Sequence, residues 1–248
     1  MESRENNTKN HYDNYLGNFY SWSAGDFISG KEKFISLFKN HKITGSTGDL
    51  KEIAIDVGAG HGIHSSALAE LGYEVLAIDF NQQLLNELKV NTAGQDVKTI
   101  YDDIKNLKHY ATQNPALIIC MGDTITHFET LNEIEKILED SFDILINGGK
   151  FITSFRDYSI ELKNNDRFIP VKSDENRILL CFLEFFKDKV KVNDLFYEKQ
   201  NGNWKFNVSS YCKYRLSENR MSEILKNTGF KILDKFIDNG MIYFICEK

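Results

Sequence analysis

Three glycines at alternate positions, 58, 60 and 62, follow an acidic residue at the end of an apolar run. Residues 53–55 are apolar and predict a short buried strand, which Asp56 closes, and a helical pattern begins after the last glycine. Because glycine has no Cβ, such a loop lets the polar groups of a ligand lie against the backbone. The spacing differs from the G-x-G-x-x-G fingerprint of dinucleotide sites, since Ile63 stands where that fingerprint needs glycine or alanine.

The segment Asp-Val-Gly-Ala-Gly-His-Gly at residues 56–62 resembles the first motif of class I S-adenosylmethionine-dependent methyltransferases. In that family the loop wraps the methionine and ribose parts of the cofactor. The resemblance therefore implies that Asp56, Gly58, Ala59 and Gly60 contact S-adenosylmethionine. The alternative is a tight strand-to-helix turn in another kind of α/β protein.

A second acid, Asp79, ends the next predicted strand, residues 73–79. A carboxylate at that place can accept hydrogen bonds from both hydroxyls of a ribose. The family has its ribose-binding acid at this strand end, so the resemblance assigns that role to Asp79 and makes the adjacent Phe80 a further cofactor contact. The alternative is an acid that caps the helix expected at residues 82–90.

Two acids, Asp102 and Asp103, follow the third predicted strand, residues 97–101, and precede Ile104. In the family an acid here binds the adenine amino group, and the next backbone N–H meets a ring nitrogen. Asp103 before Ile104 matches that order better than Asp102 does, and all three residues are expected at the cofactor. The alternative is an acidic turn that faces solvent.

Polar residues also follow the fourth predicted strand, residues 116–121, whose apolar character suits the centre of a parallel sheet. Ligands bind beyond the carboxyl ends of such strands, so Met121 and Gly122 are expected beside the cofactor, with Asp123 and His127 near its reactive end. The stretch is similar to that of glycine N-methyltransferase-like enzymes, which often have asparagine where this chain has Asp123. Aspartate there could hold an ammonium group or accept a proton from the nucleophile. His127 is either a base or a histidine that caps or packs a helix.

The fifth predicted strand, residues 150–155, is followed by Arg156. Glycine N-methyltransferase has a similar arginine at this strand end, where it binds the carboxylate of the substrate. A guanidinium suits that role because it is planar and always charged. The alternative is a salt bridge with a nearby acid such as Asp157 or Asp123.

The N-terminal segment, residues 11–22, is dense in aromatic side chains and ends at Trp22. An aromatic lid over the site would exclude water and attract the cationic sulfonium of the cofactor. Trp22 is therefore counted among the expected cofactor contacts. The alternative is a helix that packs its aromatic side chains on the domain core.

Strand and helix patterns alternate along residues 53–155, which predicts an α/β fold with a doubly wound, mostly parallel, Rossmann-like sheet of seven strands. Three consecutive strand patterns, at 177–186, 190–198 and 204–215, predict an antiparallel insertion over the active site. A final helix and a hairpin follow. The expected parts are an N-terminal aromatic helical lid (1–45), a cofactor-binding methyltransferase domain (46–160 and 216–248) and an antiparallel substrate cover (161–215).

Composition limits the possible partners. The 248 residues are 42% hydrophobic, as in a globular protein, and the formal charge of −6 gives no electrostatic reason to bind nucleic acid. No run approaches the roughly 18 apolar residues of a membrane span. The four cysteines are scattered without a C-x-x-C pair, which favours reduced thiols in a cytoplasmic protein and no metal site. We expect a monomer or small homo-oligomer whose partner is a small-molecule substrate, with no nucleic acid and no membrane.

Together, the motifs predict transfer of a methyl group from S-adenosylmethionine to a small-molecule acceptor, with S-adenosylhomocysteine as the product. The expected acceptor is an amine nitrogen of a small carboxylate-bearing compound. Arg156 would anchor its acidic group, and Asp123 or His127 would orient or deprotonate the nucleophile. The alternatives are O- or S-methylation of a secondary metabolite and a catalytically silent cofactor-binding protein. Ile63 disfavours a nicotinamide-dependent oxidoreductase.

Overall fold

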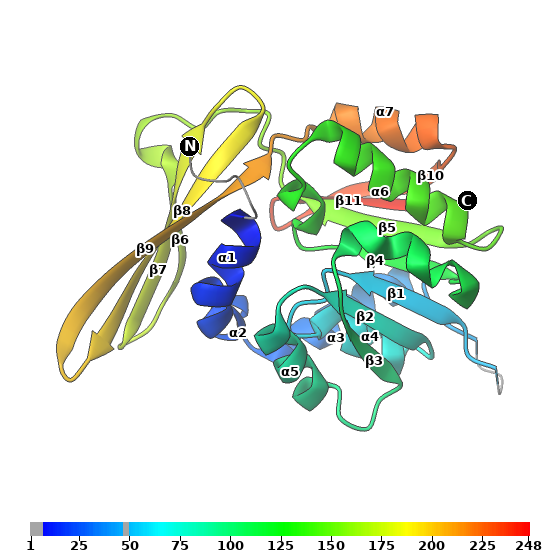
Figure 1. Cartoon of the computed structure of the whole chain (residues 1–248), viewed down its shortest axis with the longest axis horizontal. Helices are drawn as coiled ribbons and strands as arrows, with labels where there is room; N and C mark the ends of the chain where they lie inside the picture. The colour runs from blue at the N-terminus through cyan, green and yellow to red at the C-terminus, as the bar shows by residue number, and fades with distance from the viewer. Residues whose placement is uncertain (1–6, 47–49) are drawn as a thin grey trace.

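The computed structural model describes residues 7–46 and 50–248 and contains two separate β-sheets (Figure 1). Residues 1–6 of the expected lid and residues 47–49 of the expected methyltransferase domain lie outside the described residues. Figure 1 shows the larger sheet with its helices on one side of the molecule, the smaller sheet on the other, and the N-terminal helices between them.

The larger sheet has seven strands in the order β10-β11-β5-β4-β1-β2-β3. Strands β1 to β5 are parallel, whereas β11 pairs antiparallel with β5 and with β10. The chain runs outward from β1 to β3 and returns to β4 on the other side of β1, so the carboxyl ends of β1 and β4 border the crevice where doubly wound sheets bind ligands. The predicted seven-stranded sheet is confirmed. Its strands are β1 (Ile53–Val57), β2 (Glu74–Asp79), β3 (Val97–Tyr101), β4 (Leu117–Cys120), β5 (Lys150–Phe155), β10 (Lys231–Asp238) and β11 (Met241–Glu247).

Helices cover both faces of this sheet, and alternate residues of each strand point to opposite faces. Ala54 belongs to the apolar core on the side of α3 and α4, and Ile55 to the core on the side of α6 and α7. Although α3 falls inside the expected lid, it packs Ile35 and Phe38 into the core beside α4, so the segment between the two sheets ends before α3. The helices of these layers are α3 (Phe27–Asn40), α4 (Ile63–Glu70), α5 (Gln82–Asn91), η2 (Ile104–Gln113), η3 (Thr124–His127), α6 (Leu131–Ile144) and α7 (Glu218–Thr228).

The smaller sheet is antiparallel, with the order β6-β7-β8-β9. Asn201 and Gly202 link its two longest strands with φ of +50° and +82°, the left-handed conformations that a tight two-residue hairpin turn requires. Strand β6 was absent from the prediction; it is an edge strand that contains Pro170, and proline weakens a strand pattern. The elements are η4 (Asn164–Arg167), β6 (Phe168–Ser173), β7 (Arg177–Phe185), β8 (Lys189–Gln200) and β9 (Asn203–Tyr214).

The N-terminal segment, comprising α1 (Asn7–Asn14), η1 (Leu16–Asn18) and α2 (Tyr20–Ala24), contacts both sheets. Phe19 stacks on Phe196 of β8, with 4.1 Å between ring centroids. On the other side, Lys9 Nζ donates a hydrogen bond to the carbonyl oxygen of Phe80, 3.0 Å away, at the end of β2. Among the described residues, no helix is both long and apolar enough to cross a membrane.

Candidate functional site

Three neighbouring cavities lie beyond the carboxyl ends of the parallel strands. The loop cavity is lined by the glycine loop, Asp79 and Met121, and the acid cavity by Asp102 and Asp103. The tyrosine cavity lies between the larger and smaller sheets and is lined by four tyrosines, Tyr12, Tyr20, Tyr158 and Tyr211, together with charged side chains. His127 lines all three cavities, so they adjoin one another and are treated together as one candidate site.

The glycine loop needs its glycines for two different reasons, although all three have positive φ. A Cβ on Gly58 would lie 2.5 Å from Thr124 Cγ2, and one on Gly62 would lie 2.5 Å from Leu88 Cγ, so these two glycines allow close packing. The atoms nearest to a Cβ on Gly60 would belong to the side chain of Tyr20, at 3.6 Å, which is an ordinary van der Waals contact. Gly60 therefore presents bare backbone to the loop cavity, as a ligand cradle requires.

Asp56 lies behind this loop and lines none of the three cavities. Its side chain is buried, Oδ2 accepts a hydrogen bond of 2.6 Å from Ser65 Oγ, and Oδ1 has no partner among the described residues. Burial raises the pKa of Asp56 to about 7 because few groups compensate the charged form. The side chain thus connects β1 to the start of α4 rather than reaching the cavity.

Asp79 connects the end of β2 to the glycine loop. Its Oδ2 accepts a hydrogen bond from the backbone N–H of Gly60, and its Oδ1 accepts one from the N–H of Asn81, both at 2.8 Å. Burial raises the pKa of Asp79, and these backbone hydrogen bonds partly offset that effect. Each carboxylate oxygen can accept a further hydrogen bond, and Asp79 lines the loop cavity with Phe80.

The two acids after β3 have different surroundings. Asp102 accepts hydrogen bonds from Asn106 Nδ2 and from the hydroxyl of Tyr110, so its carboxylate is bound within η2. Asp103 caps the start of η2 and is exposed. Both acids line the acid cavity, and Ile104 lines the acid and the loop cavities. Asp103 is therefore the freer of the two acids, since its carboxylate accepts one hydrogen bond, from the N–H of Lys105.

Asp123 is the centre of a charged cluster at the end of β4. Its Oδ1 accepts a 2.6 Å hydrogen bond from the backbone N–H of Arg156, and its Oδ2 contacts Arg156 Nη1 at 2.6 Å and Lys213 Nζ at 2.8 Å. Burial alone would raise the pKa of Asp123, but the two cations hold it well below its usual range. Burial lowers the pKa of Lys213, and Asp123 outweighs this and raises it. All three groups are therefore charged at neutral pH.

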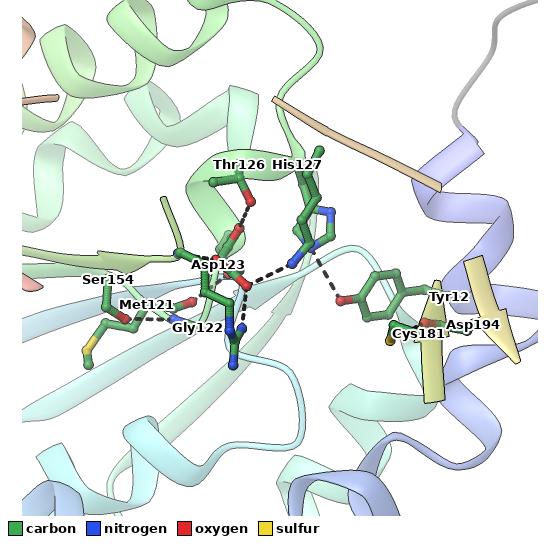
Figure 2. A network of polar contacts seen from close by, with 12 residues as sticks. Tyr12, Met121, Gly122, Asp123, Thr126, His127, Ser154, Cys181 and Asp194 are labelled. Carbon is green, nitrogen blue, oxygen red and sulfur yellow. Dashed lines mark hydrogen bonds and ion pairs between the residues drawn. The ribbon is translucent and has the colours of Figure 1, made fainter. Parts of the chain in front are cut away.

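His127 lies between Asp123 and Tyr12 (Figure 2). Its Nε2 is 3.5 Å from the hydroxyl of Tyr12, and its buried Nδ1 has no hydrogen-bond partner among the described residues. Burial lowers the pKa of His127 to about 3, and the Lys213 ammonium adds to that effect. The ring is therefore neutral and a weak base at physiological pH.

Lys213 and Tyr211 were not predicted as site residues from the sequence. Tyr211 and Lys213 are two positions apart on β9 and hence point to the same face of the smaller sheet, which is the face that lines the tyrosine cavity. The sequence signal that could have identified Lys213 is a lysine on the inward-facing side of a predicted strand. Its partner Asp123 follows β4 of the other sheet, and no local pattern connects the two residues.

Trp22 lies beside the smaller sheet and lines none of the three cavities. Its indole Nε1 donates a 2.6 Å hydrogen bond to Asp174 Oδ2, and its ring packs near Phe196. The aromatic residues of the N-terminal segment that line the loop cavity are Tyr12 and Tyr20. The aromatic side chains that the N-terminal segment contributes to the loop cavity are therefore tyrosines, and Trp22 is not among them.

Comparison with known proteins identifies a methyltransferase domain. Residues 54–149 match a family model described as "Methyltransferase domain". The chain is 26% identical over 144 residues to the glycine/sarcosine N-methyltransferase of Aphanothece halophytica, covering 57% of this chain and 51% of that protein. It is 27% identical over 146 residues to the glycine/sarcosine/dimethylglycine N-methyltransferase of Actinopolyspora halophila, covering 54% of this chain and 26% of that protein. The chain thus spans about half the length of the first of these relatives and about a quarter of the second.

Solved structures share the fold over nearly the whole chain. A S-adenosylmethionine-dependent methyltransferase from Clostridium acetobutylicum has a TM-score of 0.72 at 19% identity and covers 95% of each chain. The CcbJ methyltransferase from Streptomyces caelestis has a TM-score of 0.78 at 14% identity and covers 96% of this chain and 98% of its own. At these identities the likeness concerns the fold, including the smaller sheet.

Proposed function

We propose that this chain, which belongs to the class I S-adenosylmethionine-dependent methyltransferases, transfers a methyl group from S-adenosylmethionine to an amine nitrogen of a small carboxylate-bearing acceptor. One observation carries the cofactor part of the proposal. The glycine loop and Asp79 form a single hydrogen-bonded unit, through Gly60, at the switch point of the sheet. This unit presents backbone and a carboxylate to one cavity, which is what the ribose and methionine parts of the cofactor need.

The lining residues fit the remaining parts of the cofactor. Asp103 would accept a hydrogen bond from the adenine amino group, and the backbone N–H of Ile104 would donate one to a nitrogen of the adenine ring. Phe80 would flank that ring. Met121 and Gly122 would lie beside the sulfonium, where the loop and tyrosine cavities meet. We assign the aromatic cover to Tyr12 and Tyr20, and to Asp56 the role of supporting the loop through Ser65. When bound, S-adenosylmethionine supplies a methyl group already activated by the sulfonium.

The tyrosine cavity, of about 370 Å³, has the size and chemistry for a small acidic acceptor. Asp123 accepts hydrogen bonds from the backbone N–H and from Nη1 of Arg156. The guanidinium is half-exposed, and its Nη2 and Nε have no acceptor among the described residues, so they can donate hydrogen bonds to an acidic group of the acceptor. The acceptor would then extend from Arg156 toward Gly122, which lines both this cavity and the loop cavity.

The surroundings of the two candidate bases favour an amine over a hydroxyl acceptor. Both oxygens of Asp123 already bind cations or backbone N–H groups, and His127 has a pKa of about 3. Neither group is suited to remove the proton of a hydroxyl. The neutral fraction of an amine needs no base: its lone pair forms the new N–CH₃ bond, the S–CH₃ bond breaks with its electron pair left on sulfur, and the proton leaves the product ammonium for solvent. The residues then contribute alignment and exclusion of water.

The test of the cofactor is calorimetric titration with S-adenosylmethionine, S-adenosylhomocysteine and a nicotinamide cofactor. We expect the two sulfur nucleotides to bind and the nicotinamide cofactor not to bind. Gly60→Ala should weaken binding, because the added methyl group enters the loop cavity beside Tyr20. Gly94→Ala is the matched control, since Gly94 also has positive φ, +81°, and a Cβ there meets nothing within 4 Å. Equal affinities of the two variants would contradict the loop assignment.

A second assay tests the acceptor class. Labelled methyl transfer from S-adenosylmethionine is measured with small amino acids, with simple amines and with hydroxy acids of similar size. We expect product from amino acids. Transfer only to the hydroxyl compounds would overturn the proposed amine, and cofactor binding without transfer to any acceptor class would favour a catalytically silent cofactor-binding protein.

A further inference from the structure

We propose that Lys213 is an acceptor-binding residue that, with Arg156, forms a two-cation seat for the acidic group of the acceptor. The proposal rests on the proposed function, because it concerns the substrate of the same site. Lys213 comes from β9 of the smaller sheet and reaches across the tyrosine cavity to Asp123 at the end of β4. It therefore gives the smaller sheet a chemical role in choosing the substrate.

The charges of the cluster do not balance. One carboxylate, Asp123, faces two cations, Arg156 and Lys213, at 2.6 and 2.8 Å. The other acid that lines the tyrosine cavity is Asp194, which has partners of its own. It is hydrogen-bonded to His11 Nε2 at 3.0 Å and accepts a hydrogen bond from the thiol of Cys181. Asp194 forms an ion pair with neither cation among the described residues, so the cluster of Asp123, Arg156 and Lys213 by itself has one positive charge in excess, which a bound carboxylate would neutralise.

Lys213 is more than a partner for Asp123. Arg156 already gives Asp123 two hydrogen bonds, so a second cation is not needed to keep the carboxylate satisfied. The side chain of Lys213 is only 7% exposed, and removing an ammonium group from water is costly unless its donors are used. Of its three N–H donors, the described structure gives one a hydrogen-bond acceptor, Asp123 Oδ2. The remaining donors are available to a ligand in the cavity.

The geometry of the seat suits a single carboxylate. Arg156 Nη1 and Lys213 Nζ bind the same oxygen of Asp123, which holds the two cations close enough together for one acidic group to bridge them. The rings of Tyr158 and Tyr211 lie 5.6 and 5.9 Å from Lys213 Nζ, and these rings limit its movement. An acceptor held there by its acid can direct its other end toward the loop cavity.

The two-cation seat accounts for the aspartate at position 123. A neutral amide there could not hold two cations at the cavity, whereas a carboxylate fixes both and lowers the cost of burying Lys213. Asp123 then acts as a positioning residue for the seat and not as a base. Specificity for an acid over its amide follows, because the amide would leave the excess charge without a counter-ion.

The test measures binding to the complex of the protein with S-adenosylhomocysteine, so that no turnover is needed. The probes are sarcosine and 4-(methylamino)butyrate, each compared with its primary amide, by calorimetry. The variants are Lys213→Met, which removes the charge at similar length, and Lys213→Arg, which retains it. Lys191→Met is the matched control, because Lys191 lies on the neighbouring strand, half-exposed beside Glu184, and outside the three cavities.

We expect at least one of the two acids to bind the wild-type complex and its amide to bind at least tenfold more weakly. Lys213→Met should weaken binding of the acid by about 10–100-fold, as loss of a charge-assisted hydrogen bond implies, and leave the affinity for S-adenosylhomocysteine unchanged. Lys213→Arg should recover part of the loss, and Lys191→Met should behave as wild type. Unchanged S-adenosylhomocysteine affinity also shows that Lys213→Met is folded.

The possible failures are distinguishable. If Lys213→Met binds the acids as tightly as wild type does, Lys213 has only a structural role, and the proposed function stands with Arg156 as the anchor. If wild type binds acids and amides equally, or binds neither acid, the acidic acceptor class fails together with the seat. If S-adenosylhomocysteine itself does not bind, the cofactor proposal is wrong.

Discussion

Replacing Asp56 with asparagine is expected to stabilise the cofactor-free protein more at pH 8 than at pH 5. Asp56 is 1% exposed, its Oδ1 has no hydrogen-bond partner among the described residues, and burial raises its pKa from 3.8 to about 7. An aspartate with a higher pKa in the folded than in the unfolded protein lowers the free energy of unfolding as pH rises between the two values. The loss is complete above the higher value, which is near pH 7.

The magnitude follows from the two pKa values. At about 1.4 kcal/mol per pKa unit, the free energy of unfolding of the wild-type protein falls by about 3 kcal/mol between pH 5 and pH 8 because of Asp56. The Asp56→Asn variant does not undergo this decrease. Asparagine keeps an acceptor for the Ser65 hydroxyl, so the substitution changes the charge and conserves the shape. The measurement is urea-induced unfolding of both proteins at pH 5 and pH 8, followed by far-ultraviolet circular dichroism.

Asp123→Asn is the matched control for this experiment. Asp123 is also a buried carboxylate, but Lys213 and Arg156 hold its pKa well below its usual range. Its replacement leaves a buried ammonium without a counter-ion and should destabilise the protein by about 3 kcal/mol at both pH values. An equal effect of Asp56→Asn at pH 5 and pH 8 would refute the reasoning, because Asp56 would then be ionised at both.

Three further predictions concern the same site. Gly58→Ala should lower the melting temperature more than Gly122→Ala does. Both glycines have positive φ, +76° for Gly58 and +69° for Gly122, but only a Cβ at Gly58 would lie 2.5 Å from Thr124. Equal decreases in melting temperature would contradict this packing argument. Asp79→Asn should weaken S-adenosylhomocysteine binding by about 10–100-fold, because a charged acceptor is lost; unchanged affinity by calorimetry would place the ribose elsewhere. His127→Gln should leave the pH dependence of the methyl-transfer rate between pH 6 and pH 9 unchanged, because a pKa of about 3 makes the ring neutral throughout; loss of an inflection in the pH–rate profile would identify His127 as a base.

The larger sheet was predictable because its signals are local. The sequence features that predict it lie within a few residues of the elements that they specify. Examples are the apolar run before Asp56 and the acids at the ends of the strands. The smaller sheet was predicted less completely, since its edge strand β6 is short and contains Pro170. A proline demotes a strand pattern, and an edge strand tolerates it.

The cofactor end of the site was also accessible from sequence, and its roles stay predictions. Asp79 and Asp103 could be placed because the carboxyl ends of parallel strands meet at one edge of a doubly wound sheet. Trp22 could not be placed in the same way. Which aromatic residue of the N-terminal segment lines the loop cavity depends on how that segment packs between the two sheets, and there Tyr20 lies over Gly60 while Trp22 binds Asp174.

The sequence by itself determined the alternating strands and helices of the larger sheet, the glycine loop and the acids at the strand ends, because these features arise from residues close together in the chain. Only the tertiary structure decided what the charged residues do. Asp123 could be a base on sequence grounds, but it is occupied by Arg156 and by Lys213, a residue of the other sheet. His127 could be a base as well, but its burial leaves it neutral. Ionisation depends on desolvation and on charges within a few ångströms, and the chain brings those together only when the two sheets face each other.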